Sequence, residues 1–267
     1  MIIREKPASS ILNKSGIPGI SWAINPYTGC LHSCVYCYAS FMRRFTSHPE
    51  PWGRFLDIKV NAPELLEKAL RRKTITGTVM LSSVTDAYQY AEAKYRITRR
   101  LLEILLEHDA RVEILTKSDL VTRDIDLLKR FSNVSVGLSI MTADDRAGRL
   151  FEPYSPLPAK RLAALAKLKE SGISTWAFIS PFLPGISDLE ALLKKLHGIA
   201  DETAIEAFNM RGACLAGIKK VIARHYASML AGWEMQASDN RYWDHVESLG
   251  KSLARKNGIG FSGLYRH

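Results

Sequence analysis

The sequence predicts an α/β fold in one domain, residues 1–267, whose parallel sheet curls into a barrel or stays open and carries a helical C-terminal extension. Two observations predict it. Short apolar segments alternate with amphipathic ones from about residue 20 to residue 210, and residues 211–267 have a helical pattern. No linker or low-complexity stretch separates these parts. Because strands that alternate with helices are joined by right-handed crossovers, they imply a parallel sheet.

Strand patterns recur through the core. Residues 78–84 are apolar and β-branched, as in a strand that is covered on both faces. Residues 133–140 alternate apolar and polar positions with the period of two expected for a strand. The expected strands are residues 21–27, 78–84, 111–116, 133–140, 175–182 and 204–210.

Helical patterns follow these strands. Residues 97–107 place their apolar side chains in one stripe, and residues 158–171 start at a proline and are followed by Gly172, typical of a helix start and stop. The expected helices are residues 62–73, 97–107, 124–131, 158–171 and 188–199 in the core, and 216–232 and 242–256 in the extension, before a short tail.

Composition limits where the protein works and what it meets. No stretch reaches the roughly 20 apolar residues that span a bilayer, and the first residues lack a signal-peptide pattern, so we expect a cytoplasmic protein without a membrane partner. The formal net charge is +10, which attracts polyanions, so nucleic acid is an expected partner. The alternative is a generally basic surface that binds no partner.

Three of the four cysteines lie in one short segment, with the spacing Cys30-x3-Cys34-x2-Cys37. In a reducing compartment such a cluster indicates metal ligands and not disulfides. Thiolates hold iron–sulfur clusters, and three of them on a four-iron cubane leave one iron free to bind an outside molecule. The alternative is a zinc site completed by His32 or Cys214, because structural zinc takes four protein ligands.

The Cys-x3-Cys-x2-Cys spacing, with Tyr36 before the third cysteine, resembles the signature of the radical S-adenosylmethionine (SAM) superfamily. The surrounding segments resemble the branch that contains spore photoproduct lyase and its "DNA repair photolyase-like" relatives. The segments that carry this second resemblance are Asn25-Pro26-Tyr27-Thr28-Gly29-Cys30, Thr85-Asp86-Ala87-Tyr88-Gln89, Leu115-Thr116-Lys117-Ser118 and Leu150-Phe151-Glu152-Pro153.

The resemblance implies a partial (β/α)6 barrel of the TIM type. It also implies that Cys30, Cys34 and Cys37 hold a [4Fe–4S] cluster whose free iron is chelated by SAM. An electron from the reduced cluster then cleaves SAM to methionine and a 5′-deoxyadenosyl radical, which abstracts hydrogen from the substrate. Such an enzyme needs an external electron donor, similar to flavodoxin or ferredoxin.

Residues at the ends of strands are the expected SAM contacts, because barrels of this kind place their chemistry there. The resemblance implies that Ser83 and Asp86 lie near the SAM amino group. It places Lys117 against the SAM carboxylate and Ser139 against the ribose. For each residue a structural role is the alternative: Asp86 capping a turn, Lys117 in solvent, Ser139 packed in its strand. Glu152 is a weaker candidate, since a glutamate before proline also suits an exposed loop.

Two tyrosines and one cysteine are the candidates for radical transfer. By resemblance to the lyase, Tyr36 and Tyr38 either contact SAM and pass on a radical or simply pack around the cluster. The lyase takes a hydrogen atom from a cysteine near the end of its second strand, where this chain has Ser82 and Ser83. A serine O–H bond is too strong for that role, so Cys214 is either the donor or a small buried apolar residue.

The sequence thus predicts SAM-dependent radical chemistry on an unidentified substrate, with nucleic acid favoured. The segment Phe41-Met42-Arg43-Arg44-Phe45 mixes cations and aromatic rings, as nucleic-acid-binding surfaces do, or is an amphipathic helix with solvated arginines. The alternatives are radical modification of a protein or a small metabolite, and an iron–sulfur electron carrier or redox sensor that does not turn over SAM.

Overall fold

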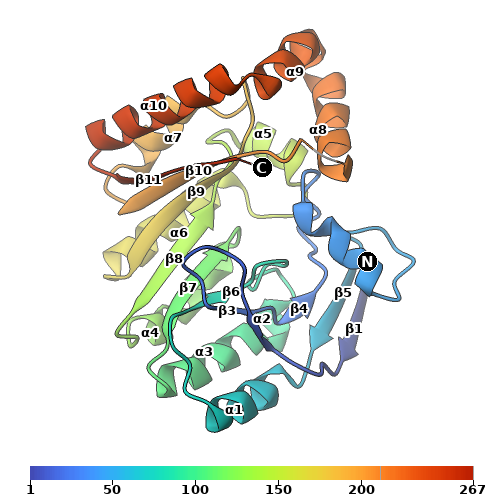
Figure 1. Cartoon of the computed structure of the whole chain (residues 1–267), viewed down its shortest axis with the longest axis vertical. Coiled ribbons are helices and arrows are strands. Elements are labelled where there is room, and N and C mark those ends of the chain that lie inside the picture. The colour runs from blue at the N-terminus through green and yellow to red at the C-terminus, as the bar shows by residue number, and fades with distance from the viewer. Residues whose placement is uncertain (211, 267) are drawn as a thin grey trace.

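In the computed structural model, which describes residues 1–210 and 212–266, an eight-stranded sheet forms the centre of the molecule (Figure 1). Seven strands run parallel, and only β2 is antiparallel to its neighbour. In spatial order they are β11 (Gly260–Tyr265), β10 (Glu202–Ala207), β9 (Ser174–Phe182), β8 (Val134–Ser139), β7 (Arg111–Thr116), β6 (Thr78–Leu81), β3 (Trp22–Ile24) and β2 (Leu12–Lys14).

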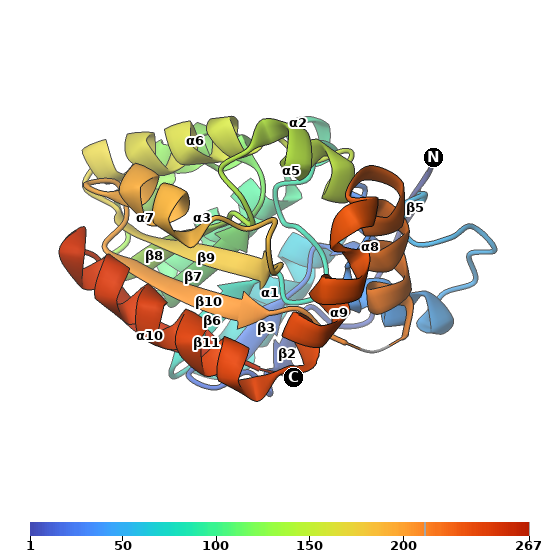
Figure 2. The ribbon, with the colours of Figure 1, turned by 90° about the horizontal axis from the view of Figure 1, so that it is seen from above.

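Helices cover the outer face of this sheet. Figure 2 shows α6 (Pro158–Glu170) and α7 (Leu189–Leu196) along β8 and β9, and α10 (Asn240–Lys256) packs against β10 and β11. The remaining helices are α1 (Ala62–Arg72), α2 (Glu92–Tyr95), α3 (Ile97–Glu107), α4 (Ile125–Leu128), α5 (Asp145–Phe151), α8 (Gly212–His225) and α9 (Leu230–Ser238), with 3₁₀ turns η1 (Tyr38–Phe45), η2 (Asp119–Asp124) and η3 (Ala227–Met229). No helix among the described residues is both long and apolar enough to cross a membrane.

The two faces of β9 differ in burial over its first half. Along β9, Thr175, Ala177 and Ile179 are buried under the helices, whereas Trp176 and Phe178 on the inner face are only half-buried. The sheet order ends at β11 and at β2, which do not pair with each other, so the barrel is partial, as expected. This confirms an α/β fold with a parallel sheet curled around an open inner face.

A second, small sheet supports the segment that leads into the cysteines. It consists of β1 (Ile2–Lys6), β5 (Phe55–Lys59) and β4 (Tyr27–Thr28), with β5 in the middle. His48 is buried beside it, with Nε2 2.8 Å from Asp57 and Nδ1 3.0 Å from Glu50. Because β4 ends one residue before Gly29, this sheet fixes where the cysteine segment begins.

Three expectations about elements were wrong in detail. The expected strand 21–27 is split, since β3 ends at Ile24 and Tyr27 belongs to β4 of the small sheet. The expected helix 216–232 is divided, because α8 ends at His225 and α9 starts at Leu230. The short tail is a strand, β11, which pairs in parallel with β10 and adds a seventh parallel strand to the expected six. The other expected strands and helices lie within a few residues of their expected places, whereas β1, β2, β5, α2 and α5 were not expected.

Candidate active site

The cysteine segment, residues 29–38, lies beyond the carboxyl ends of the first two barrel strands. The Asn25 side chain, just after β3, binds the backbone N–H groups of Ser83 and Val84, just after β6, at 3.0 and 3.1 Å. Gly29 has a φ of +94°, and a Cβ there would come within 2.5 Å of the Phe55 carbonyl oxygen, so this position requires glycine. We call residues 29–38 the cysteine loop.

One side of the cysteine loop is held by the segment 85–89. Gln89 is fully buried, and its side-chain oxygen accepts a hydrogen bond from Leu31 N at 2.9 Å. Thr85 donates to the Gly29 carbonyl at 2.5 Å, and Gln89 donates back to Thr85 at 3.1 Å. The backbone on both sides of Cys30 is therefore fixed by this one turn.

The other side is held by the end of α5 and the residues after it. Val35 N donates to the Phe151 carbonyl at 2.9 Å, and Tyr154 N donates to the His32 carbonyl at 3.3 Å. The Tyr36 hydroxyl donates to the Glu152 carboxylate. Glu152 is buried, so the exposed-loop interpretation of this residue was wrong. Sequence reasoning gave it a weak place in the site, whereas the structure makes it a main support of the loop.

Helix α8 and Trp52 close the remaining sides. A Cβ on Gly217 of α8 would come within 2.1 Å of the Val35 carbonyl oxygen, so glycine lets the helix approach the loop closely. The Trp52 indole N–H is buried and makes no hydrogen bond that meets the geometric limits. Burial raises the pKa of the Cys37 thiol, and the Trp52 side chain partly offsets this rise. Neither residue stood out in the sequence.

Lys117 and Ser139, at the ends of β7 and β8, meet at the site. Lys117 Nζ donates to Ser139 Oγ at 2.8 Å and lies 3.9 Å from Glu152 Oε1. It also lies 5.7 Å from the centre of the Tyr36 ring. Ser139 is buried and donates to the Ser180 carbonyl at 3.2 Å. Two expected SAM contacts from different strands are thus brought together, and Lys117 is mostly withdrawn from solvent.

A buried arginine completes this group. Arg161, from α6, is fully buried; its guanidinium binds the Glu152 carboxylate and donates to the Ser139 carbonyl at 2.9 Å. Burial would raise the pKa of Glu152, but Arg161 and then Lys117 lower it overall, so the carboxylate stays charged. Arg161 was not expected from the sequence, where it stands in an ordinary helical pattern.

Asp86 is saturated by protein partners. It is buried and accepts hydrogen bonds from Tyr88 N at 2.8 Å, Thr116 Oγ1 at 2.6 Å and Lys117 N at 2.8 Å. His32 Nε2 lies 3.1 Å away but is not aligned as a hydrogen bond. Burial would raise the pKa of Asp86, and His32 with the hydrogen bonds lowers it well below the ordinary range. These contacts match the turn-capping alternative and also tie the cysteine loop to β7.

Ser83 and Tyr38 are in contact with each other. The Tyr38 hydroxyl donates to the Ser83 carbonyl, and Ser83 Oγ accepts from the Asn25 amide at 3.2 Å. Tyr38 remains 52% exposed. The preceding Ser82 has a φ of +72°, and its hydroxyl is buried with no hydrogen-bond partner. The end of β6 therefore offers a free polar group beside the cysteine loop.

Cys214 lies close to the cysteine loop although it is far away in the sequence. It is buried, at 8% exposure, in α8. Burial raises the pKa of its thiol, and Cys37 raises it further. The same helix approaches the loop at Gly217, where a Cβ would come within 2.1 Å of the Val35 carbonyl oxygen. Both interpretations of Cys214, as a donor near the site and as a buried apolar residue, agree with this position.

Burial disfavours the thiolate form of the loop thiols. Burial raises the pKa of Cys30 and brings that of Cys34 to about 12. A bound metal displaces the thiol proton and stabilises the thiolate. Among the described residues, no group of three or more His, Cys, Asp or Glu side chains is arranged to hold a single metal ion. Three thiols on one loop, with the fourth cysteine on α8, are a donor set that fits a multi-iron cluster.

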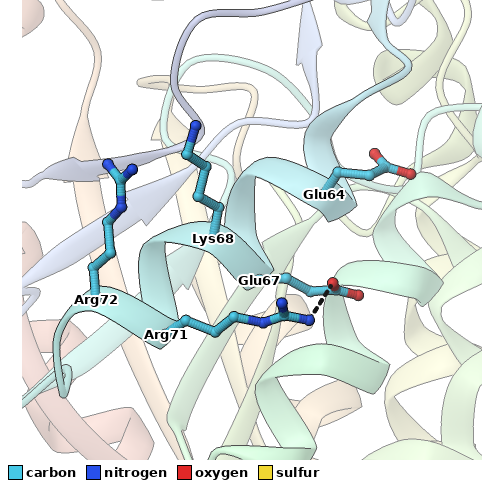
Figure 3. Close-up of a pocket in the computed structure, with 5 residues that line it drawn as sticks. All are labelled: Glu64, Glu67, Lys68, Arg71 and Arg72. Atoms are coloured by element: carbon cyan, nitrogen blue, oxygen red, sulfur yellow. Dashed lines mark ion pairs between the residues drawn. The ribbon is translucent and has the colours of Figure 1, made fainter.

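A shallow hollow elsewhere on the surface is not part of this site. Figure 3 shows it on α1, where Arg71 pairs with Glu67 at 3.5 Å in the company of other charged side chains. Arg71 and Arg72 are exposed, as expected for solvated residues at a helix end. In Figure 1, α1 lies at the opposite end of the molecule from α8, which packs against the cysteine loop.

Comparison with known proteins gives the family of this chain. Residues 24–196 match the Radical SAM superfamily. The chain belongs to the radical SAM superfamily. This radical SAM chain is also 34% identical over 260 residues to an uncharacterized protein of Methanocaldococcus jannaschii, covering 97% of this chain and 96% of that one. Membership indicates an enzyme and implies SAM and an iron–sulfur cluster as cofactors.

One further sequence and one solved structure are similar to this radical SAM chain. It is 26% identical over 188 residues to the radical SAM Nalpha-GlyT isomerase of Pseudomonas phage M6, covering 68% of this chain and 38% of that one. The structure of spore photoproduct lyase complexed with dinucleoside spore photoproduct matches with a TM-score of 0.70 at 16% identity, covering 98% of this chain and 82% of that one. At that identity the match shows a shared fold.

Proposed function

We propose that Cys30, Cys34 and Cys37 hold a [4Fe–4S] cluster with one iron left for SAM, and that the enzyme modifies a nucleic acid or nucleotide by radical chemistry. The observation that carries the proposal is the set of three thiols on one loop, held on every side by other parts of the chain. The fourth cysteine belongs to another element, α8. When bound, the cluster and SAM supply an electron and a 5′-deoxyadenosyl radical.

The chain's own residues prepare the SAM site. Lys117 presents an ammonium group at the ends of the strands, where it can pair with the SAM carboxylate as a point charge. Ser139 presents a hydroxyl beside it for the ribose. Ser83 and the free hydroxyl of Ser82 lie at the end of β6, where the SAM amino group is expected. In this arrangement Asp86 is a positioning residue, since its oxygens already accept three hydrogen bonds.

Tyr36, Tyr38 and Cys214 surround Cys37 in this proposal. Tyr36 is held by Glu152, and Tyr38 by Ser83, so both rings are fixed close to the loop. Cys214 is the described cysteine that is left over once the three ligands are assigned. Its thiol is therefore our candidate hydrogen-atom donor, in place of the serines at the end of β6.

The nucleic-acid assignment has two supports. The net charge of +10 attracts polyanions. A solved structure that resembles this one, spore photoproduct lyase, is described as complexed with a dinucleoside spore photoproduct. An external electron donor, similar to flavodoxin or ferredoxin, completes the proposed system.

Anaerobic reconstitution tests the proposal. We expect about four irons per chain and release of 5′-deoxyadenosine when dithionite and SAM are added. Cys34→Ala should lose the cluster, whereas Cys214→Ala should keep both the iron and SAM cleavage because Cys214 is not a ligand. A single zinc per chain, or a cluster whose Mössbauer spectrum does not change with SAM, would refute the proposal. A stable cluster without SAM cleavage would instead indicate an electron carrier.

A further inference from the structure

Two arginine–aromatic pairs lie beside the cysteine loop. The Arg44 guanidinium lies over Phe41 at 5.4 Å and over Phe45 at 4.7 Å from the ring centres. Arg54 lies over Tyr154 at 5.6 Å. The side chains of these residues make none of the contacts that hold the cysteine loop.

Both pairs are attached to the loop itself. The turn η1, which carries the Arg44 pair, starts at Tyr38, directly after Cys37. Tyr154 donates its backbone N–H to His32 at 3.3 Å. Residues 53 and 33 are in close contact, because a Cβ on Gly53 would come within 2.2 Å of the Ser33 hydroxyl oxygen. A ligand on either pair would therefore lie next to the candidate active site.

The aromatic rings of these pairs are unusually exposed. Phe45 is 67% exposed, Phe41 42% and Tyr154 45%. Single exposed apolar residues are normal on a protein surface, but large ones gathered around one loop are typical of an interaction site. Phe41 and Phe45 contact each other edge to face, with ring centres 6.4 Å apart, so they form one unit.

The charges on this surface indicate an anionic partner. Arg43 is occupied, because it donates to the backbone carbonyls of Pro49 and Glu50 at 2.7 and 2.8 Å. Within the described part of the chain, neither Arg44 nor Arg54 pairs with a carboxylate. A guanidinium without an anion is suited to bind a phosphate through two parallel hydrogen bonds.

We propose that this surface, made of Tyr38, Phe41, Arg44, Phe45, Arg54 and Tyr154, binds single-stranded nucleic acid and brings it to the site. Exposed rings stack on bases, and arginines beside them neutralise the phosphates. A duplex hides the faces of its bases, so it gains only the phosphate contacts. The inference deepens the proposed function and rests on it, and it identifies the surface that selects the substrate.

Fluorescence anisotropy of the anaerobic, cluster-loaded enzyme with labelled oligothymidylate of 12 nucleotides tests this inference. Phe45→Ala and Phe41→Ala should each weaken binding about tenfold, the usual effect of losing one stacked base. Arg44→Gln should weaken binding and lower the slope of log K against log salt by about 0.7. The matched control is Arg71→Gln, which removes the same charge from α1 (Figure 3) and should leave binding almost unchanged.

The same preparations separate this inference from the proposed function. We expect all four variants to release 5′-deoxyadenosine with dithionite at the wild-type rate. If 5′-deoxyadenosine forms but the η1 variants bind oligothymidylate as the wild type does, the surface inference fails alone. If the η1 substitutions slow only reduction by a flavodoxin, the surface belongs to the electron donor, and the inference is equally overturned. If the oligonucleotide binds through these residues but no 5′-deoxyadenosine forms, the proposed function fails instead.

Discussion

At the scale of single residues, the cysteine loop is held by side chains that are not metal ligands. Gln89 and Thr85 bind the backbone around Cys30, and Glu152 binds Tyr36. In a metal site such supports matter, because partners outside the ligand set orient the ligands and tune the metal. The segments 85–89 and 150–153, which resemble the lyase branch, therefore contribute mainly to this support.

Gln89→Leu tests the support directly. The substitution leaves Leu31 N–H buried without an acceptor, so we expect a loss of about 1–3 kcal/mol in the free energy of unfolding. We also expect fewer irons per chain after anaerobic reconstitution. Ser132→Ala, which removes an exposed hydroxyl bonded to Asp109, should change stability by less than about 0.5 kcal/mol. Equal iron content and equal stability in the two variants would contradict this role of Gln89.

Glu152 and Arg161 form a buried ion pair. Removing only one of the two partners should lower the free energy of unfolding. Glu152→Ala leaves the Arg161 charge buried and unpaired, at a cost of about 3–5 kcal/mol. The double variant Glu152→Ala with Arg161→Met also removes the unpaired guanidinium. It should therefore recover part of the lost free energy of unfolding. Urea denaturation of the cluster-free protein measures both. A double variant no more stable than the single one would show that the pair is not the cause.

At the scale of elements, close packing at glycines sets how neighbouring strands and helices meet. Gly137 on β8 is in register with Trp176 on β9, and a Cβ at Gly137 would come within 2.2 Å of the indole ring. Gly217 similarly allows α8 to contact the cysteine loop. Neither glycine lies in a turn, so its role is to make room for a neighbour.

Gly137→Ala should therefore be destabilising although alanine suits a strand no worse than glycine. The added methyl must displace Trp176, and overpacking of this kind typically costs about 1–3 kcal/mol. Gly16→Ala is the matched control, because a Cβ added at Gly16 would have nothing within 4 Å. Thermal melts followed by circular dichroism compare the two. A melting temperature lowered equally in both variants would exclude the Trp176 contact as the reason.

Most elements could be predicted from the sequence because their patterns are local. The helix 158–171 has a proline at its start and a glycine after its end, and α6 spans Pro158–Glu170. Strand β11 could not be predicted in this way. The burial of its six residues, Gly260–Tyr265, alternates only as far as Gly263, and they become a strand by pairing with β10. The small sheet was missed for the same reason, since β1 is exposed along its whole length.

At the scale of the whole molecule, buried carboxylates make stability depend on pH. The pKa values of Asp86 and Glu152 lie below their ordinary values of 3.8 and 4.5, despite burial, because neighbouring cations and hydrogen bonds favour the charged form. At low pH the unfolded chain therefore binds more protons than the folded chain. Their contribution to stability is complete above about pH 4.5 and is lost as the pH falls further.

Asp86 and Glu152 should leave the melting temperature of the cluster-free protein nearly unchanged between pH 7 and pH 5. Below about pH 4.5 their protonation should lower it. Melts at constant ionic strength measure it. Asp86→Asn should be less stable at pH 7 but lose less on acidification, since one of the two titrating groups is gone. A wild-type melting temperature at pH 4 equal to that at pH 7 would rule out this coupling.

The sequence by itself determined the three-cysteine motif and the class of fold. Cys30, Cys34 and Cys37 lie within eight residues of one another, so their spacing places three thiols on one loop before any tertiary contact forms. The alternation of strands and helices is equally local. Only the tertiary structure decided what surrounds the thiols. Gln89 reaches Leu31 across 58 positions, Glu152 reaches Tyr36 across 116, and Cys214 approaches from the C-terminal extension. Such contacts depend on how distant elements pack, and no local pattern specifies that packing.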